Sequence, residues 1–311
     1  MPTSPTPTVV HRARAPRIAP FALLALLAPA AVAAQGAGAA PAARAAPAAA
    51  AAPDLSGYQR LLDDYLVVVS APGRPLDTRF DYERLYDARD RDARLDAVRA
   101  QMFAVPPSAM APRARLAWAL NAYNFLVLEQ ATRNLLIPGK GRTRHTDPRM
   151  IRVKGWEFFK APVVTIEGVE YSLDAFERTF VRLGWKAGAE PMPEGFDPRV
   201  HFALVCGARG CPPLMPRVYR ADSLDRQLDA ATRNALAMPR HLRYDGARLE
   251  VSEMFRWYMA EFGGRSGALD FIRRHAPPKL RARLEADRVS ALHGFIPWDW
   301  TLNQFPRNQV Q

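Results

Sequence analysis

Residues 112–136, PRARLAWALNAYNFLVLEQATRNLL, place apolar side chains on nearly every face of a helix. Pro112 suits the first turn, because its missing N–H would have no helical partner there, and Pro138-Gly139 marks the end. A helix with a single apolar stripe lies at a surface, whereas one that is apolar all round is covered on every side. The sequence therefore predicts a central buried helix around which the other elements pack.

Two asparagines interrupt the apolar character of this helix. Asn121 and Asn124 lie three residues apart and so share a face. A buried amide must find hydrogen-bond partners. Either the two amides tie loop backbone to the core helix, or they face a substrate, and the sequence leaves both interpretations open.

The remaining pattern alternates helices with hairpins. Apolar spacing predicts helices in 56–69, 81–102, 173–183, 224–236 and 253–262. Glu167-Gly168 and Asp245-Gly246 are turn pairs that predict hairpins in 163–173 and 241–251, and Ser172 and Ser252 are suited to cap the helices that follow. Because no regular strand-helix-strand spacing appears, we expect an α+β fold: a mainly helical single domain with a small antiparallel sheet and hairpins.

Both cysteines lie in HFALVCGARGCPPL, residues 201–214. The preceding run 199–206 is apolar, β-branched and aromatic, which predicts a strand covered on both faces. In a regular strand His201 and Cys206 would lie about 16 Å apart on opposite faces, at roughly 3.3 Å per residue. A base for a Cys206 nucleophile would then come from elsewhere, and the histidines and orienting carboxylates to consider are His145, His241, His275, His293, Glu177 and Asp299.

The second cysteine follows a turn of glycines. Residues 207–210 can fold Cys211 back beside Cys206, where Arg209 would favour a thiolate. The same turn can bring the two Cα atoms within the roughly 4.4–6.8 Å that a disulfide requires. In an oxidising compartment two cysteines tend to pair, so a Cys206–Cys211 disulfide is an alternative to a free nucleophile, and a redox-active pair is a third interpretation.

Several segments together resemble a known family, the domain of unknown function 547 (DUF547). They occur in the family's order along the chain and are LAWALNAYN (116–124), YSLDAFE (171–177), DPRVHFALVCGARGCPPL (197–214), LEVSEMFRWYMAEFG (249–263) and PWDWTLN (297–303). The family commonly has Ile-Glu-His where this chain has Phe176-Glu177-Arg178, so any role of that histidine is absent here. Some members have serine in place of the second cysteine, which favours Cys206 over Cys211 as the reactive thiol.

The family has no settled activity, and the resemblance implies by analogy a papain-like cysteine hydrolase fold. With the residues above it suggests a thiol-dependent hydrolase or acyl transferase acting on an unknown small molecule or peptide. The candidate catalytic residues are Cys206, His201, Asn121, Asn124 and Glu177. The alternative function is a non-enzymatic envelope binding or structural protein with a Cys206–Cys211 disulfide.

The N-terminal residues predict a targeting segment. Arg12, Arg14 and Arg17 form a basic flank before an apolar run, 21–34, that is too short and alanine-rich for a typical membrane span. We expect a signal peptide over 1–35, an Ala/Pro-rich disordered linker over 36–53 and the DUF547-like domain over 54–311. This organisation predicts a periplasmic or secreted protein, with an uncleaved N-terminal anchor as the alternative.

The charge balance bears on partners. The chain has a formal net charge of +12; four of its 43 basic residues and none of its 31 acidic ones precede Asp54, which leaves +8 for the rest. That balance favours anionic envelope components. Arginines alternate with acidic residues, as in YDARDRDARLDAVRA, so specific nucleic-acid binding is not expected.

Motifs for metals and nucleotide cofactors are missing from the sequence. The six histidines form no His-x-x-x-His or His-Glu-x-x-His array, and the cysteines lack a second ligand pair. There is no Walker or Rossmann glycine pattern and no Gly-x-Ser-x-Gly elbow. We therefore expect neither metal nor cofactor, and no serine-esterase chemistry.

Overall fold

The computed structural model describes residues 52–183 and 196–306. They belong to one compact unit, Pro47–Gln311. The predicted signal peptide, and all of the predicted linker except Ala52 and Pro53, lie outside the described residues. Among the described helices, none combines the length and the apolar character needed to cross a membrane.

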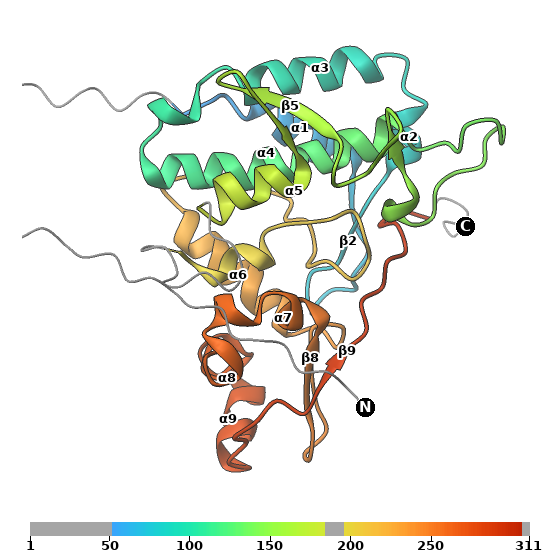
Figure 1. Cartoon of the computed structure of the whole chain (residues 1–311). Coiled ribbons are helices and arrows are strands. Elements are labelled where there is room, and N and C mark those ends of the chain that lie inside the picture. Colours follow the sequence, from blue (N-terminus) through green and yellow to red (C-terminus); the bar gives the residue numbers. More distant parts are fainter. Residues whose placement is uncertain (1–51, 184–195, 307–311) are drawn as a thin grey trace, which may run out of the picture. The chain divides into compact units, whose positions relative to one another are not determined.

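The predicted central helix is confirmed. Helix α4 runs from Pro112 to Arg133, and every residue from Ala117 to Thr132 is buried. Helix α3 (Arg91–Met102) lies along it in Figure 1, and α1 (Ser56–Tyr65) packs beside α3. The side chains of these helices and of the segments around them form the larger of two hydrophobic clusters.

Two predicted helices are shorter than expected. The segment 56–69 is helical only to Tyr65, after which the β-branched residues form strand β1 (Leu66–Val68), paired antiparallel with β2 (Thr78–Phe80). The segment 81–102 divides into α2 (Tyr82–Tyr86), capped by the Asp81 carboxylate, and α3. Aspartates flank this division, and aspartate is a poor residue for a helix interior.

Both predicted hairpins are present. Strands β5 (Pro162–Ile166) and β6 (Val169–Ser172) join through Glu167 and Gly168, which both have positive φ. Ser172 caps α5 (Leu173–Phe176), accepting a hydrogen bond from the Ala175 N–H, and a π-helical turn (Glu177–Val181) follows.

Strands β7 (Leu242–Tyr244) and β8 (Leu249–Ser252) form the second hairpin, and β9 (Gly294–Ile296) adds parallel to β8. A short hairpin pairs β3 (Arg152–Val153) with β4 (Trp156–Glu157). The fold is thus the predicted α+β type.

The predicted strand at 199–206 is wrong. Residues Pro198–Phe202 form a 3₁₀ helix, and a loop leads from there to Cys206. The Asp197 carboxylate accepts a hydrogen bond from the Arg199 N–H, and Pro198 suits the first helical position, so a turn starts where a strand was expected. An apolar run indicates burial, and buried strands and buried loops both have such runs, so the run alone does not predict a strand.

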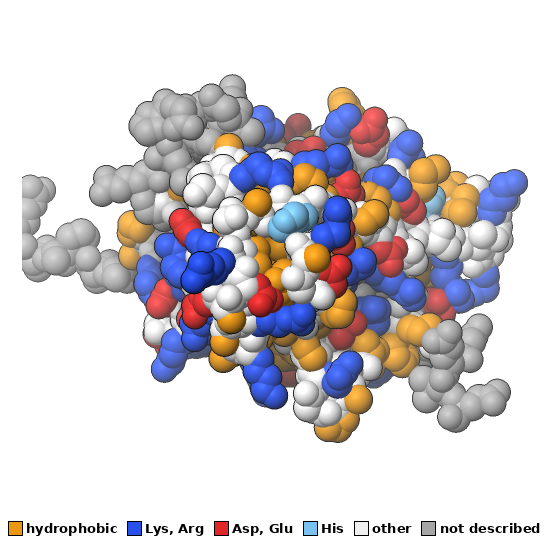
Figure 2. Space-filling model, turned by 90° about the horizontal axis from the view of Figure 1, so that it is seen from below, with side chains coloured by type: hydrophobic (Ala, Val, Ile, Leu, Met, Phe, Trp, Pro, Cys, Tyr) orange, Lys and Arg blue, Asp and Glu red, His pale blue; other side chains and the backbone are white. Residues whose placement is uncertain are grey.

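The second hydrophobic cluster belongs mainly to the later part of the chain. Its helices are α6 (Leu224–Leu236), α7 (Glu253–Trp257), α8 (Gly264–His275) and α9 (Pro278–Ala286), with a 3₁₀ turn at Met259–Phe262. In place of the single predicted helix over 253–262, α7 and this turn end at Gly263, whose φ is 79°. Seen from below in Figure 2, basic side chains alternate with acidic ones on the surface, as the mixed charge pattern of the sequence predicts.

The segment after β9 connects the two parts of the fold. It is the red segment that runs from β9 toward α2 in Figure 1. Leu302 forms an isolated bridge with Ala208, and Gln304 forms one with Phe80. Trp298 packs against both hydrophobic clusters. The C-terminal segment therefore holds the cysteine loop against the rest of the molecule.

Candidate thiol site

The cysteine loop is shaped by two glycines. Gly207 has φ 82°, which favours glycine, and its carbonyl accepts a hydrogen bond from the Asn303 N–H at 2.7 Å. At Gly210 a Cβ atom would lie 2.7 Å from Trp298 Cδ2, too close for a side chain. The Gly210 N–H donates to the Asp299 carbonyl at 2.8 Å. These contacts bend residues 206–211 into a compact turn.

The turn brings the two cysteines together as free thiols. The Cys206 N–H donates to Cys211 Sγ at 3.0 Å. Cys206 is half-buried, whereas Cys211 is 4% exposed. The predicted approach of Cys211 to Cys206 therefore occurs, and the structure contains the reduced pair.

The two thiols have opposite pKa shifts. The hydrogen bond to Cys211, together with burial, raises the pKa of Cys206 well above its usual value. Burial acts to raise the pKa of Cys211 too, but hydrogen bonds from the Cys206 thiol and the Cys206 and Ala208 backbone, with the charge of Arg240, outweigh it, so the pKa of Cys211 is lowered. The two thiols therefore titrate as a coupled pair, in which the Cys211 sulfur accepts a hydrogen bond from the Cys206 thiol and has the lowered pKa.

The cysteine pair opens onto a pocket of about 230 Å³. Its wall comes from α4, from α5 and the π-helical turn, from the cysteine loop, from α7 and from the segment after β9. The lining residues are Tyr123, Phe159, Asp174, Glu177, His201, Leu204, Val205, Cys206, Cys211, Pro212, Met254, Trp257, Tyr258, Trp298 and Trp300. Three of the five candidate catalytic residues, Cys206, His201 and Glu177, lie in this one wall.

A polar network stands beside the cysteines. The Tyr258 hydroxyl donates to Glu177 Oε1 at 3.1 Å, and the Tyr258 ring stacks on the His201 ring at a centroid distance of 3.9 Å. His201 Nε2 is hydrogen-bonded to Glu261 Oε2 at 2.7 Å, and Glu261 also pairs with Arg182. His201 Nε2 is therefore directed at Glu261, and the His201 ring contacts Tyr258 in the pocket wall.

Glu177 is the acidic group of the network. Desolvation raises its pKa, although the charges of His201 and Arg182 and the hydrogen bond from Tyr258 act in the opposite direction. Tyr123 is within electrostatic reach of both Glu177 and Cys206, and burial raises its own pKa further above its usual value. The wall thus offers a carboxyl that holds its proton to higher pH than usual, beside a phenol that stays neutral.

Asn121 and Asn124 do not line the pocket. Asn121 donates to the carbonyls of Ala117 and Tyr219 and accepts from the Tyr219 N–H. Asn124 donates to the Ala203 carbonyl at 2.9 Å and accepts from the Val205 N–H at 2.9 Å. Both side-chain amides bond to backbone groups, so they tie loop backbone to the core helix. Asn124 in this way positions the residues that lead to Cys206.

The other histidines of residues 52–183 and 196–306 lie outside the pocket wall. His241 is fully buried next to Arg240, and burial lowers its pKa to about 3, so it is neutral. His275 approaches Asp229 at 3.3 Å, and His293 Nδ1 accepts from the Leu249 N–H at 2.9 Å. Asp299 accepts from the Thr301 N–H at 2.9 Å. None of these four is placed to act directly on a pocket ligand.

Several pocket residues were not singled out from the sequence. Tyr123 was counted with the buried face of the central helix, and Trp257 and Tyr258 fit a helical core pattern. Trp257 is 39% exposed, which is high for tryptophan. The available signal was the position of Tyr123 within LAWALNAYN, between two asparagines that bind the loops beside it. Within 52–183 and 196–306, no group of three or more His, Cys, Asp or Glu side chains is arranged to hold a metal ion.

Fold and site define an α+β protein in which a cysteine pair opens onto an aromatic pocket. Residues 107–236 match the family model described as "Protein of unknown function, DUF547", a segment that contains α4, Glu177 and both cysteines. This match over residues 107–236 confirms the resemblance to the DUF547 family that the sequence motifs predict. No curated protein and no solved structure matches the chain. The papain-like analogy therefore stays a prediction.

Proposed function

We propose that this protein is a thiol-dependent hydrolase or acyl transferase with Cys206 as its nucleophile. The observation that supports the proposal is the single pocket wall shared by the cysteine pair and Glu177. An acyl transfer needs a nucleophile, an acceptor for the nucleophile's proton and an acid for the leaving group. The three groups are available on that wall.

Cys211 is the proton acceptor in this proposal. As the acyl carbonyl approaches Cys206, the Cys206 proton passes to the Cys211 thiolate, and Cys206 Sγ forms the bond to the acyl carbon. The bond from that carbon to the leaving group breaks, and the Glu177 carboxyl donates its proton to the leaving atom. Water or a second acceptor then attacks the thioester and returns Cys206, with the proton balance restored through Glu177 and Cys211.

Alkylation of the folded protein tests this assignment. We expect iodoacetamide at alkaline pH to label Cys206, located by peptide mass spectrometry, because the raised pKa of this thiol keeps it protonated at lower pH. Cys206→Ser is expected to remove that label. Cys211→Ser keeps the reactive sulfur but removes the proton acceptor, so hydrolysis of a test ester is expected to fall about tenfold or more. Labelling of Cys206 is not expected to fall in this variant, because the contact with Cys211 raises the pKa of Cys206. Reduced, folded protein that is labelled only after unfolding would overturn the proposal.

A second candidate function is a non-enzymatic envelope protein in which Cys206 and Cys211 form a disulfide. The 3.0 Å contact between the Cys206 N–H and Cys211 Sγ favours it, because the two residues need little movement to bond. Protein isolated without reductant is then expected to weigh two hydrogens less than reduced protein. Two free thiols in such material would contradict this candidate.

Export is part of both candidates. The basic flank, the apolar run and the alanine-rich residues before Asp54 support it. We propose a periplasmic or secreted location, where anionic envelope components would be partners of the basic surface. N-terminal sequencing of protein recovered from the envelope is expected to find a start near residue 36, whereas an intact Met1 in that fraction would indicate an anchor instead.

A further inference from the structure

The pocket wall differs in charge from the rest of the molecule. The chain has a net charge of +12, yet the described lining residues include no Lys or Arg. The charged side chains on the wall are the carboxylates of Asp174 and Glu177, with His201 as the remaining titratable base. The pocket wall is therefore acidic, although the protein as a whole is basic.

Two buried glutamates elsewhere in the described residues are paired with arginine. Glu129 bonds to Arg99 and Arg133, and Glu261 bonds to Arg182. Glu177 and Asp174 form no ion pair with Lys or Arg within the described part of the chain; Glu177 has the Tyr258 hydroxyl as its partner. The pocket therefore presents negative groups that a cationic ligand would complement.

The remaining wall is aromatic. Trp257 contacts Trp298 at a ring-centroid distance of 4.9 Å and Trp300 at 5.9 Å. Tryptophan faces attract cations, and ammonium groups are bound by aromatic walls of this composition. Trp300 forms one such cation–π contact within the protein, because the Arg149 guanidinium lies 4.5 Å from the Trp300 ring centroid.

We propose that the pocket binds an alkylammonium group, held by the tryptophans and neutralised by the Asp174 carboxylate and by Glu177 in its ionised form, which is the form that remains after Glu177 has given up its proton. Resting on the proposed function, this makes the substrate an acyl compound that carries a positively charged amine close to the acyl bond. The volume of about 230 Å³ is below the roughly 300–1,000 Å³ of pockets for drug-sized ligands, so the group it takes is small.

The binding test uses two probes of equal shape. Choline carries a quaternary ammonium, and 3,3-dimethyl-1-butanol has the same shape without the charge. Each is titrated into full-length Cys206→Ser under reducing conditions, with calorimetry and tryptophan fluorescence as readouts. We expect choline to bind at least about tenfold more tightly than the alcohol. Equal affinities, or no saturable choline binding, would overturn the inference.

A pair of variants locates the binding. Glu177→Gln in the same background is expected to weaken choline binding severalfold while leaving the affinity for the alcohol unchanged. Asp270→Asn is the matched control, because Asp270 is an exposed carboxylate that pairs with Arg273 outside the pocket. Equal loss in both variants would contradict the pocket as the site.

Turnover separates this inference from the proposed function. The wild-type protein is assayed with a choline ester and with the 3,3-dimethylbutyl ester of the same acid. Choline binding with no turnover of either ester supports the ammonium site and contradicts the thiol-dependent reaction. Turnover of the neutral ester at the same or a higher rate, without choline binding, supports the reaction and overturns the ammonium site.

Discussion

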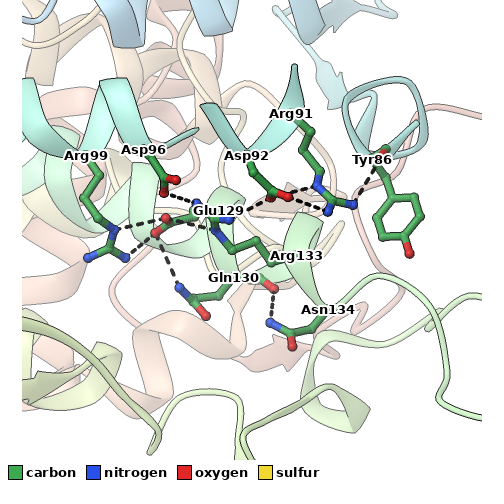
Figure 3. Close-up of polar contacts among 9 residues, drawn as sticks. All are labelled: Tyr86, Arg91, Asp92, Asp96, Arg99, Glu129, Gln130, Arg133 and Asn134. Atoms are coloured by element: carbon green, nitrogen blue, oxygen red, sulfur yellow. Dashed lines mark hydrogen bonds and ion pairs between the residues drawn. The ribbon is translucent and has the colours of Figure 1, made fainter. Parts of the chain in front are cut away.

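Two glutamates occupy opposite situations in this protein. Glu129, on α4, is 1% exposed and is surrounded by Arg99, Arg133 and Gln130, a network shown in Figure 3. Arg133 extends the network to Asp92 and Asp96 at the surface. Glu177 is half-buried at the pocket wall and has a tyrosine hydroxyl in place of a guanidinium. Glu129 thus has two guanidinium partners, whereas Glu177 forms no ion pair with Lys or Arg among the described residues.

The difference separates stability from function. A buried carboxylate costs several kcal/mol unless cations and hydrogen bonds compensate it, which explains the two arginines at Glu129. At Glu177 the charges of His201 and Arg182 and the hydrogen bond from Tyr258 compensate the desolvation only in part, so the pKa of Glu177 remains raised. Groups with raised or lowered pKa values concentrate at functional sites, because proton transfer and ligand binding use them. The four predictions below test this contrast.

The largest effect is expected from removing the cations around Glu129. Arg99→Met with Arg133→Met leaves the carboxylate buried without a charged partner, and we expect a loss of about 3–5 kcal/mol in the free energy of unfolding. Urea denaturation followed by circular dichroism measures it. Arg142→Met is the control, because Arg142 pairs with Asp87 at the exposed surface, and should change stability by no more than about 0.5 kcal/mol. A double variant as stable as this control would contradict the claim that the two arginines compensate the buried charge of Glu129.

A smaller loss is expected where the core positions the pocket. Asn124→Ala leaves the Ala203 carbonyl and the Val205 N–H without partners in a buried loop, which should cost about 2–3 kcal/mol. Because this loop leads to Cys206, labelling of Cys206 in the folded variant should also change. Unaltered stability, measured by the same denaturation, would mean that the loop finds other partners.

Glu177→Gln is expected to have a small effect whose sign depends on pH. The raised pKa means that folded protein holds this proton more tightly than unfolded protein, so the group stabilises the fold below the unfolded pKa, for which 4.5 is the ordinary value. That contribution is lost as pH rises through the folded pKa. The variant lacks this pH dependence and should equal or exceed wild-type stability above that range, within about 1 kcal/mol. A variant that is less stable at every pH would show that the carboxylate is structurally required.

The smallest change concerns the tyrosine hydroxyl alone. Tyr258→Phe keeps the ring that stacks on His201 but removes the donor to Glu177, so stability should fall by about 0.5 kcal/mol. Since that hydrogen bond lowers the pKa of Glu177, its removal should raise this pKa further. Carboxyl NMR titration of wild type and variant provides the measurement, and a pKa shift downward would contradict the network.

Local signals predicted much of the fold. Pro112 begins α4 as expected, the Glu167-Gly168 turn joins β5 to β6, and Ser172 caps α5. These features depend on the conformational preferences of residues close in the chain. The run 199–206 shows the limit, because its backbone is satisfied by Asn124, a residue of α4 about 80 positions earlier. The apolar character of this run predicts that it is buried. It does not predict which residue forms hydrogen bonds with its backbone N–H and C=O groups.

The same limit applies to the site. The sequence drew attention to Cys206, His201 and Glu177, and the structure gathers all three on one pocket wall. It could not show that His201 is bonded to Glu261, because 60 residues separate them. Nor could it show that Trp257 and Trp300, far apart in the chain, come into contact. The sequence predicted which residue types form the site. The directions of their side chains depend on packing between residues far apart in the chain, which the sequence did not predict.

The bridge between Ala208 and Leu302 has a consequence for synthesis. A nascent chain exposes its cysteines at the ribosome long before the segment that secures their loop has been translated. Until residues 298–303 emerge, Gly210 lacks the Trp298 ring above it and the Asp299 carbonyl that its amide binds. The cysteine loop therefore acquires these contacts only after residues 298–303 have been translated.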